Sequence, residues 1–198
     1  LGRNIYLLEG ATSYYPNLYV LVLGESGLTR KSTAISLIYQ FIPKIDPTLI
    51  LGSTMSKEAF LESFKSNYCH IIIYDELKQL IDNAEKSYGA GLITDFTHLW
   101  LNPPFYRVDI KNIPIEERII QTPTLNILAC STPDWLQLKE VDVLGGFLGR
   151  FLPIYSSNPQ KRMAIRPKID ETMLSELVER LRQIREVRGE YTWTDEAK

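Results

Sequence analysis

Residues 18–33 constrain the fold of this chain more than any other segment. They read LYVLVLGESGLTRKST, an apolar strand followed by a glycine-bearing turn and the start of a helix. Such a turn directs backbone N–H groups and the positive end of the helix toward an anion. In it, Lys31 reaches the outer phosphates of a nucleotide and the Ser32 hydroxyl ligates Mg²⁺. The segment predicts a phosphate-binding loop with these contact residues: Gly24, Glu25, Ser26, Gly27, Leu28, Thr29, Arg30, Lys31, Ser32 and Thr33.

This loop departs from the standard pattern in two ways. Lys31 follows Gly24 at a spacing one residue longer than usual, and Arg30 stands where a second glycine is expected. A left-handed backbone at Arg30 would cost about 1–2 kcal/mol. A different loop path would instead leave Arg30 available to a phosphate. A degenerate loop that binds nothing is a third interpretation, and the retained Lys-Ser-Thr sequence argues against it.

A second apolar segment, residues 69–74, predicts a strand that ends in Asp75 and Glu76. We expect Asp75 to hold Mg²⁺ through its water shell. Glu76 is placed to orient or deprotonate the water that attacks the γ-phosphorus. The alternative is an acidic turn that merely suits the N-terminus of the next helix. Because the lysine loop is present, we favour the catalytic interpretation.

Strand and helix patterns alternate along the chain, which predicts an α/β protein with three layers and a mainly parallel central sheet. Ligands bind at the carboxyl ends of such strands. Gly24, Asp75 and the pair Ser131 and Thr132 all fall at such ends. Thr132, or Ser131, is expected to place a hydroxyl near the γ-phosphate, to cap the following helix, or to do both. Asn126 lies in mid-strand and suits the first role less well.

The second half of the chain predicts two appended features. Residues 105–110 and 115–121 have strand patterns and predict an inserted β-hairpin with residues 111–114 at its tip. Residues 170–187 predict an amphipathic helix after a basic segment over residues 161–168. The tail beyond Gly189 is polar, and we expect it to fray. The apolar side of the predicted helix comprises Met173, Leu174, Leu177, Leu181 and Ile184.

Composition narrows the class of protein. The 198 residues are 44% hydrophobic and carry a net charge of −2, which is typical of a globular protein without global attraction to nucleic acid. Cys69 and Cys130 predict buried free thiols in a reducing cytoplasm. No apolar run approaches the roughly 20 residues of a membrane span, and no signal peptide is visible. Because the chain begins at Leu1, we expect further domains of a longer chain.

The order of these segments resembles AAA+-type and RecA-like ring ATPases, and more narrowly the helicase portion of prophage and plasmid primase–helicases. The likeness spans roughly residues 18–155 and is carried by residues 24–33, 74–76, 130–133 and 146–151. It implies a P-loop ATPase core over residues 1–160, with residues 161–198 as a partial lid or linker. It also implies ATP and Mg²⁺ as cofactors, single-stranded DNA as a partner and a homo-oligomeric ring, with a hexamer expected.

The resemblance assigns roles to three basic residues. Arg150 precedes a predicted strand, and it corresponds to an arginine finger that acts on the nucleotide of a neighbouring subunit. An ion pair with a local carboxylate such as Asp142 is the alternative. Lys111, and secondarily Arg107, matches the basic residue that similar helicases carry into the central pore on a hairpin. An ordinary hairpin with solvated charges is the plainer interpretation.

Together these observations predict a Mg²⁺-dependent ATPase that drives a ring-shaped DNA helicase or translocase in the replication of a mobile element. The alternative class is a nucleotide-binding assembly switch or helicase-loader module with little hydrolysis. A small-molecule kinase is disfavoured, because Glu76 and Arg150 have no evident role in one.

Overall fold

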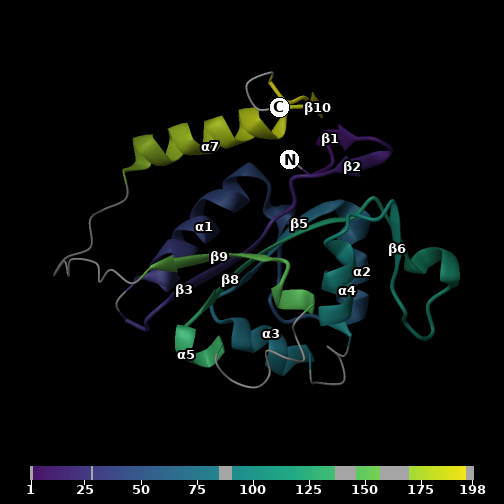
Figure 1. The fold of residues 1–198 in the computed structure, drawn as a ribbon, viewed down its shortest axis with the longest axis horizontal. Coiled ribbons are helices and arrows are strands. Elements are labelled where there is room, and N and C mark those ends of the chain that lie inside the picture. Colours follow the sequence, from purple (N-terminus) through teal and green to yellow (C-terminus); the bar gives the residue numbers. More distant parts are fainter. Residues whose placement is uncertain (1, 28, 85–90, 137–145, 157–169, 195–198) are drawn as a thin grey trace.

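The computed structural model describes residues 2–27, 29–84, 91–136, 146–156 and 170–194. Its centre is a five-stranded parallel sheet with the strand order β4-β5-β8-β3-β9 (Figure 1). This arrangement confirms the predicted α/β class and the parallel sheet. The strands are β3 (Tyr19–Gly24), β4 (Ile50–Leu51), β5 (Cys69–Tyr74), β8 (Thr124–Ser131) and β9 (Phe151–Ser156).

Apolar side chains fix the register of this sheet. Tyr19 pairs with Phe151 on one side and with Ile127 on the other, and Ile127 pairs with Ile72. This row crosses four strands, and all four side chains are buried. Burial of each contributes roughly 1.5–3 kcal/mol. A slip by one residue would turn each strand's buried side chains to the opposite face, so the register is strongly specified.

Helices cover both faces of the sheet, which is compatible with a three-layer fold. α1 (Lys31–Ile45) packs Ile35 against Ile73 and Cys130 on one face. The other face is covered by α2 (Lys57–Ser66), α3 (Leu77–Ala84) and α4 (Leu92–Leu99). A short helix, α5 (Pro133–Leu136), follows β8, and a 3₁₀ turn, η1 (Pro47–Leu49), follows α1. None of the helices in the described ranges is both long and apolar enough to cross a membrane.

The predicted hairpin is shorter than its sequence pattern. β6 (Phe105–Arg107) pairs antiparallel with β7 (Ile119–Gln121). The strand predictions were wrong for residues 108–110 and 115–118, and the latter form a 3₁₀ turn, η2 (Ile115–Arg118). Val108 and Ile110 are buried in the core, and Pro114, which lacks an N–H, precedes η2. One further backbone bond, from the Val108 N–H to the Arg118 carbonyl at 3.0 Å, extends the pairing before η2 ends it.

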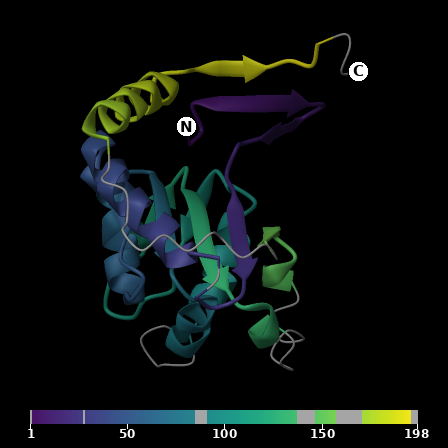
Figure 2. The same cartoon turned by 90° about the vertical axis from the view of Figure 1, so that its left-hand side faces the viewer.

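The prediction of a frayed tail beyond Gly189 was wrong for residues 190 and 191. Together with Gly189 they form β10 (Gly189–Tyr191), which pairs parallel to β1 (Ile5–Glu9), while β2 (Thr12–Tyr14) pairs antiparallel to β1 on its other edge. This small sheet lies above the main sheet and joins the two ends of the described chain (Figure 2). A polar tail is therefore ordered by backbone pairing, which its composition does not reveal.

The predicted C-terminal helix is α7 (Glu171–Arg185), and it packs on the end of α1. Arg182 Nη2 donates to the Lys44 carbonyl at 2.7 Å, and Arg185 Nη2 lies 2.6 Å from Asp46 Oδ2. Val178 is the buried apolar residue of this helix, with Leu174 and Leu181 half-buried. Met173, Leu177 and Ile184, which were predicted on the apolar side, are exposed. The basic segment 161–168 lies outside the described residues.

Candidate functional site

The loop after β3 closes tightly over its first glycine. A Cβ added to Gly24 would lie 2.6 Å from Thr29 Oγ1, so only glycine fits at this buried position. The Thr29 hydroxyl donates to the Glu25 carbonyl at 3.1 Å. Gly27 has a positive φ of 74°, which glycine adopts without steric cost. These contacts fold the segment back on itself directly before α1. Leu28 lies outside the described residues.

Lys31 turns back over this loop. Its ammonium donates to the Gly24 carbonyl at 2.6 Å and to the Glu25 carbonyl and Thr29 Oγ1 at 3.3 Å each. All three acceptors are neutral oxygens. Among the described residues, no carboxylate forms an ion pair with Lys31. An anion held in the loop would therefore meet the unneutralised charge of this ammonium.

Arg30 adopts the left-handed conformation, with φ 53° and ψ 31°. Of the alternatives stated above for the altered loop, the structure has the left-handed backbone at Arg30, which costs about 1–2 kcal/mol. Arg30 occupies the N-cap position of α1 without a side-chain cap, and the first turn has no acidic residue. The N–H groups of the first turn therefore have no intrahelical acceptor and retain their partial positive charge.

The strand order places three predicted site elements along one edge. β8 lies between β3 and β5, so Ser131 and Thr132 lie between the loop and the pair Asp75 and Glu76. Neighbouring strands are about 4.8 Å apart, which puts the ends of β3 and β5 roughly 10 Å apart. Both carboxylates are exposed, and Ser131 is buried with its hydroxyl on the Thr132 carbonyl at 3.3 Å. The acids thus face solvent beside the loop.

Cys130 lies on β8, between the strand that leads into the loop and the strand that ends before Asp75. Burial and the Asp75 carboxylate raise the pKa of its thiol and the Lys31 ammonium lowers it, with a net value of about 11. Both charged groups therefore influence the same buried thiol. The thiol itself is free and buried, as the sequence predicted, whereas Cys69 is free and half-buried.

Tyr39 is a neighbour of this site that the sequence analysis missed. Burial raises the pKa of its phenol, and the Asp75 carboxylate raises it further. Tyr39 lies two turns along α1 from Lys31. The helical spacing in the sequence places it on α1, but only the tertiary structure brings it near Asp75.

Asn126 is excluded from the site by its own contacts. Its Oδ1 accepts from the Leu18 N–H at 2.9 Å, and its Nδ2 donates to the His70 carbonyl at 3.3 Å. These bonds tie together three strands near their amino ends, away from the loop. Asn126 is therefore a structural residue, in line with its mid-strand position.

Arg150 lies at the edge of the sheet opposite to the loop. It directly precedes Phe151, which pairs with Tyr19 at the amino end of β3. A strand rises about 3.3 Å per residue, so roughly 16 Å separates Tyr19 from Gly24. Within one chain Arg150 is not part of the site; its Nη1 donates to the Gly146 carbonyl. The alternative partner, Asp142, lies outside the described residues.

Arg107 is the last residue of β6, and Lys111 lies on the segment between β6 and β7. Figure 1 shows β6 on the other side of the molecule from the start of α1. Arg107 Nε lies 3.7 Å from Asp109 Oδ1, with both side chains exposed. Lys111 is exposed as well. The structure therefore presents both cations to solvent and brings neither to the edge that carries Lys31 and Asp75.

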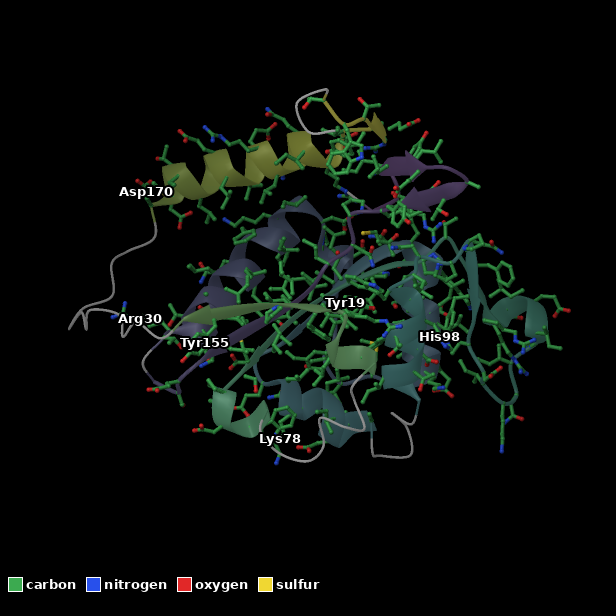
Figure 3. The ribbon with its side chains drawn as sticks, in the orientation of Figure 1. Tyr19, Arg30, Lys78, His98, Tyr155 and Asp170 are labelled. Atoms are coloured by element: carbon green, nitrogen blue, oxygen red, sulfur yellow. The ribbon has the colours of Figure 1, made fainter. Side chains whose placement is uncertain are left out.

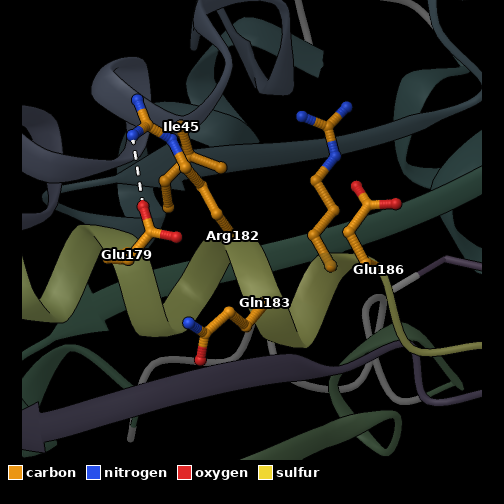
Figure 4. A pocket seen from close by; sticks show the side chains of 6 residues that line it. Ile45, Glu179, Arg182, Gln183 and Glu186 are labelled. Atoms are coloured by element: carbon orange, nitrogen blue, oxygen red, sulfur yellow. Dashed lines mark ion pairs between the residues drawn. The ribbon is translucent and has the colours of Figure 1, made fainter.

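A cavity of about 330 Å³ lies at the far end of α1, between Ile45 and one side of α7 (Figure 4). Its two arginines are engaged: Arg182 Nη1 lies 3.6 Å from Glu179 Oε2, and Arg185 pairs with Asp46. The 15 residues of α1 place this cavity roughly 20 Å from the loop. This cavity lies where α7 packs on α1 and is distinct from the site at the sheet edge.

No protein-family model matches this chain, and no curated protein matches it in sequence.

Proposed function

We propose that this chain binds Mg·ATP at the carboxyl edge of the five-stranded sheet and hydrolyses it. The observation that carries the proposal is the strand order, which brings the loop of Lys31 and the Asp75 end of β5 to one edge of the sheet on either side of β8, although 44 positions (75 − 31) separate the two residues in sequence. A cation for the phosphates and a carboxylate for the metal then share one edge. In nucleotide hydrolysis the phosphates must be neutralised and a water aligned with the γ-phosphorus.

The donor set at this edge suits Mg²⁺. A hydroxyl, from Ser32, and a carboxylate, from Asp75, are the hard oxygen ligands that this ion prefers. The described residues hold no cluster of three or more histidine, cysteine, aspartate or glutamate side chains. One or two protein ligands, such as Ser32 and Asp75, are enough for Mg²⁺ when substrate phosphates and water supply its remaining ligands. Bound there, the ion would neutralise charge on the transferred phosphoryl group.

Each side chain then has a defined task. Lys31 exchanges its carbonyl acceptors for the outer phosphate oxygens, and the first-turn N–H groups of α1 hold the anion. Glu76, next to Asp75 and exposed, orients the attacking water and accepts its proton. Thr132, at the end of the intervening β8, donates to the γ-phosphate. Arg150 reaches a phosphate site only when it comes from a second copy of the chain.

Titration calorimetry of Mg·ATP into the protein, followed by a phosphate-release assay, tests this proposal. We expect heat of binding and release of inorganic phosphate from the parent protein. Lys31→Ala removes the cation and should abolish the heat while leaving the melting temperature unchanged. Absence of heat with the parent protein would refute the assigned site.

A nucleotide-binding switch with little turnover is the second candidate, and the loop geometry favours it. The strained Arg30 and the extra residue alter the path along which the phosphates would lie. Measurable affinity for Mg·ATP without phosphate release, with or without single-stranded DNA, would select the switch. Stimulation of phosphate release by single-stranded DNA, lost in Lys111→Ala, would select the ring helicase or translocase that the resemblance implies.

A further inference from the structure

The strand on the other side of β3 ends in an exposed aromatic side chain. β9 pairs with β3 in parallel, so that Tyr155 lies opposite Leu23 and Ser156 opposite Gly24. The backbone of Tyr155 therefore lies about one strand spacing, ~4.8 Å, from the strand that leads into the loop. Its side chain is 61% exposed. Figure 3 shows Tyr155 and Arg30 at the same end of the sheet, with Tyr19 at the other end of β3.

The order of strands indicates on which side of the loop each end of a bound nucleotide would lie. Glu76 and Thr132 lie on the β5 and β8 side of the loop, so the γ-phosphate must point to that side. The triphosphate is a linear chain held at the end of β3. Its nucleoside must consequently leave the loop on the opposite side, where β9 ends.

We propose that Tyr155 stacks on the base of the bound nucleotide; this inference rests on the proposed function. Every base offers a π-face, so stacking on an aromatic ring adds affinity with little selection among bases. An exposed tyrosine ring supplies this surface at a small loss of conformational freedom, because only two torsions are ordered. The assigned role is recognition of the nucleoside, separate from the phosphate chemistry of Lys31 and Glu76.

Two ligands separate base recognition from phosphate recognition. Dissociation constants are measured by calorimetry for Mg·ATP and for magnesium tripolyphosphate, which carries the phosphates without a base. Tyr155→Ala should weaken Mg·ATP about tenfold and leave tripolyphosphate unchanged. Tyr155→Phe, which keeps the ring, should bind both like the parent. Tyr191→Ala removes a comparably exposed ring on β10 and serves as the matched control.

Each outcome decides something different. Equal weakening of both ligands in Tyr155→Ala would overturn stacking and show that Tyr155 supports the loop. Unchanged binding of both would also overturn it, while leaving the proposed function intact. If the parent binds neither ligand, the phosphate site fails, and the base contact falls with it. Thermal melting of Tyr155→Ala should match the parent, since the ring is exposed.

Discussion

The carboxyl edge of the main sheet and the junction of α2, α4 and β6 each bring a lysine near carboxylates, with opposite consequences. At the junction, Lys57 Nζ lies 3.4 Å from Asp95 Oδ2, and the Tyr106 hydroxyl donates to Asp95 Oδ1 at 2.7 Å. Asp95 is buried there. At the sheet edge, the acceptors of the Lys31 ammonium among the described residues are neutral oxygens, while Asp75 and Glu76 are exposed.

The difference shows that one lysine is paired with a carboxylate inside the fold, whereas the other has neutral oxygens as its acceptors among the described residues. In the junction, charge is neutralised within the fold, and removal of one partner leaves a buried charge unpaired. At the edge, Asp75 and Glu76 are exposed, and no ion pair between described residues neutralises Lys31, so under the proposed function a charged ligand and its metal would meet unpaired charges of both signs.

The largest expected effect tests the junction. Lys57→Met should lower the free energy of unfolding by about 3 kcal/mol, because the Asp95 carboxylate would lose its cation in a buried setting. Lys31→Met should change it far less. Urea denaturation of both variants measures this contrast. Equal losses would show that Lys31 is as structural as Lys57 and would remove the basis of the comparison.

The second test changes a carboxylate in each of the two regions. Glu76→Gln should reduce phosphate release about 100-fold while retaining Mg·ATP affinity, since the amide cannot accept the proton. Asp95→Asn is the matched change at the junction, and it should lower the melting temperature without a specific loss of nucleotide affinity. A Glu76→Gln protein with the parent rate would contradict the assigned role of Glu76.

The third test compares two residues that each precede a helix and have a left-handed backbone conformation. Arg30 precedes α1 with φ 53°, whereas Gly91 precedes α4 with φ 87°. Arg30→Gly should raise the free energy of unfolding by about 1 kcal/mol, because glycine relieves the strain. Gly91→Ala should lower it, since alanine is strained at a φ of 87°. Denaturation curves for the two variants must shift in opposite directions.

The smallest effect concerns pH. His70 is buried against the Phe64 ring, with centroids 4.6 Å apart, and burial lowers its pKa from 6.5. The folded state therefore keeps His70 neutral, while the unfolded state takes up a proton as pH falls below about 6.5. Stability should fall by about 1 kcal/mol between pH 7 and pH 5.5. In His70→Phe, denaturation midpoints should lose much of this dependence; an unchanged slope would assign it to other groups.

Local pattern predicted the elements around the candidate site better than the features that surround it. The strand before the loop, the helix after it and the strand that ends before Asp75 follow from segments whose signals lie within a few residues. The hairpin was overestimated because alternation in residues 108–110 also arises from two side chains buried in the core. The Lys57–Asp95 pair and β10 have no local signal, since their partners lie far away in the chain.

By itself, the sequence determined where strands begin and end around the loop, which cation stands at the start of α1 and which acids follow β5. Those features depend on the periodicity and turn chemistry of neighbouring residues. Only the tertiary structure decided that β8 separates the loop from the acids, that Arg150 lies at the opposite edge and that Tyr155 borders the loop. Strand order and register are set by the burial of side chains remote in sequence, and no short segment encodes them.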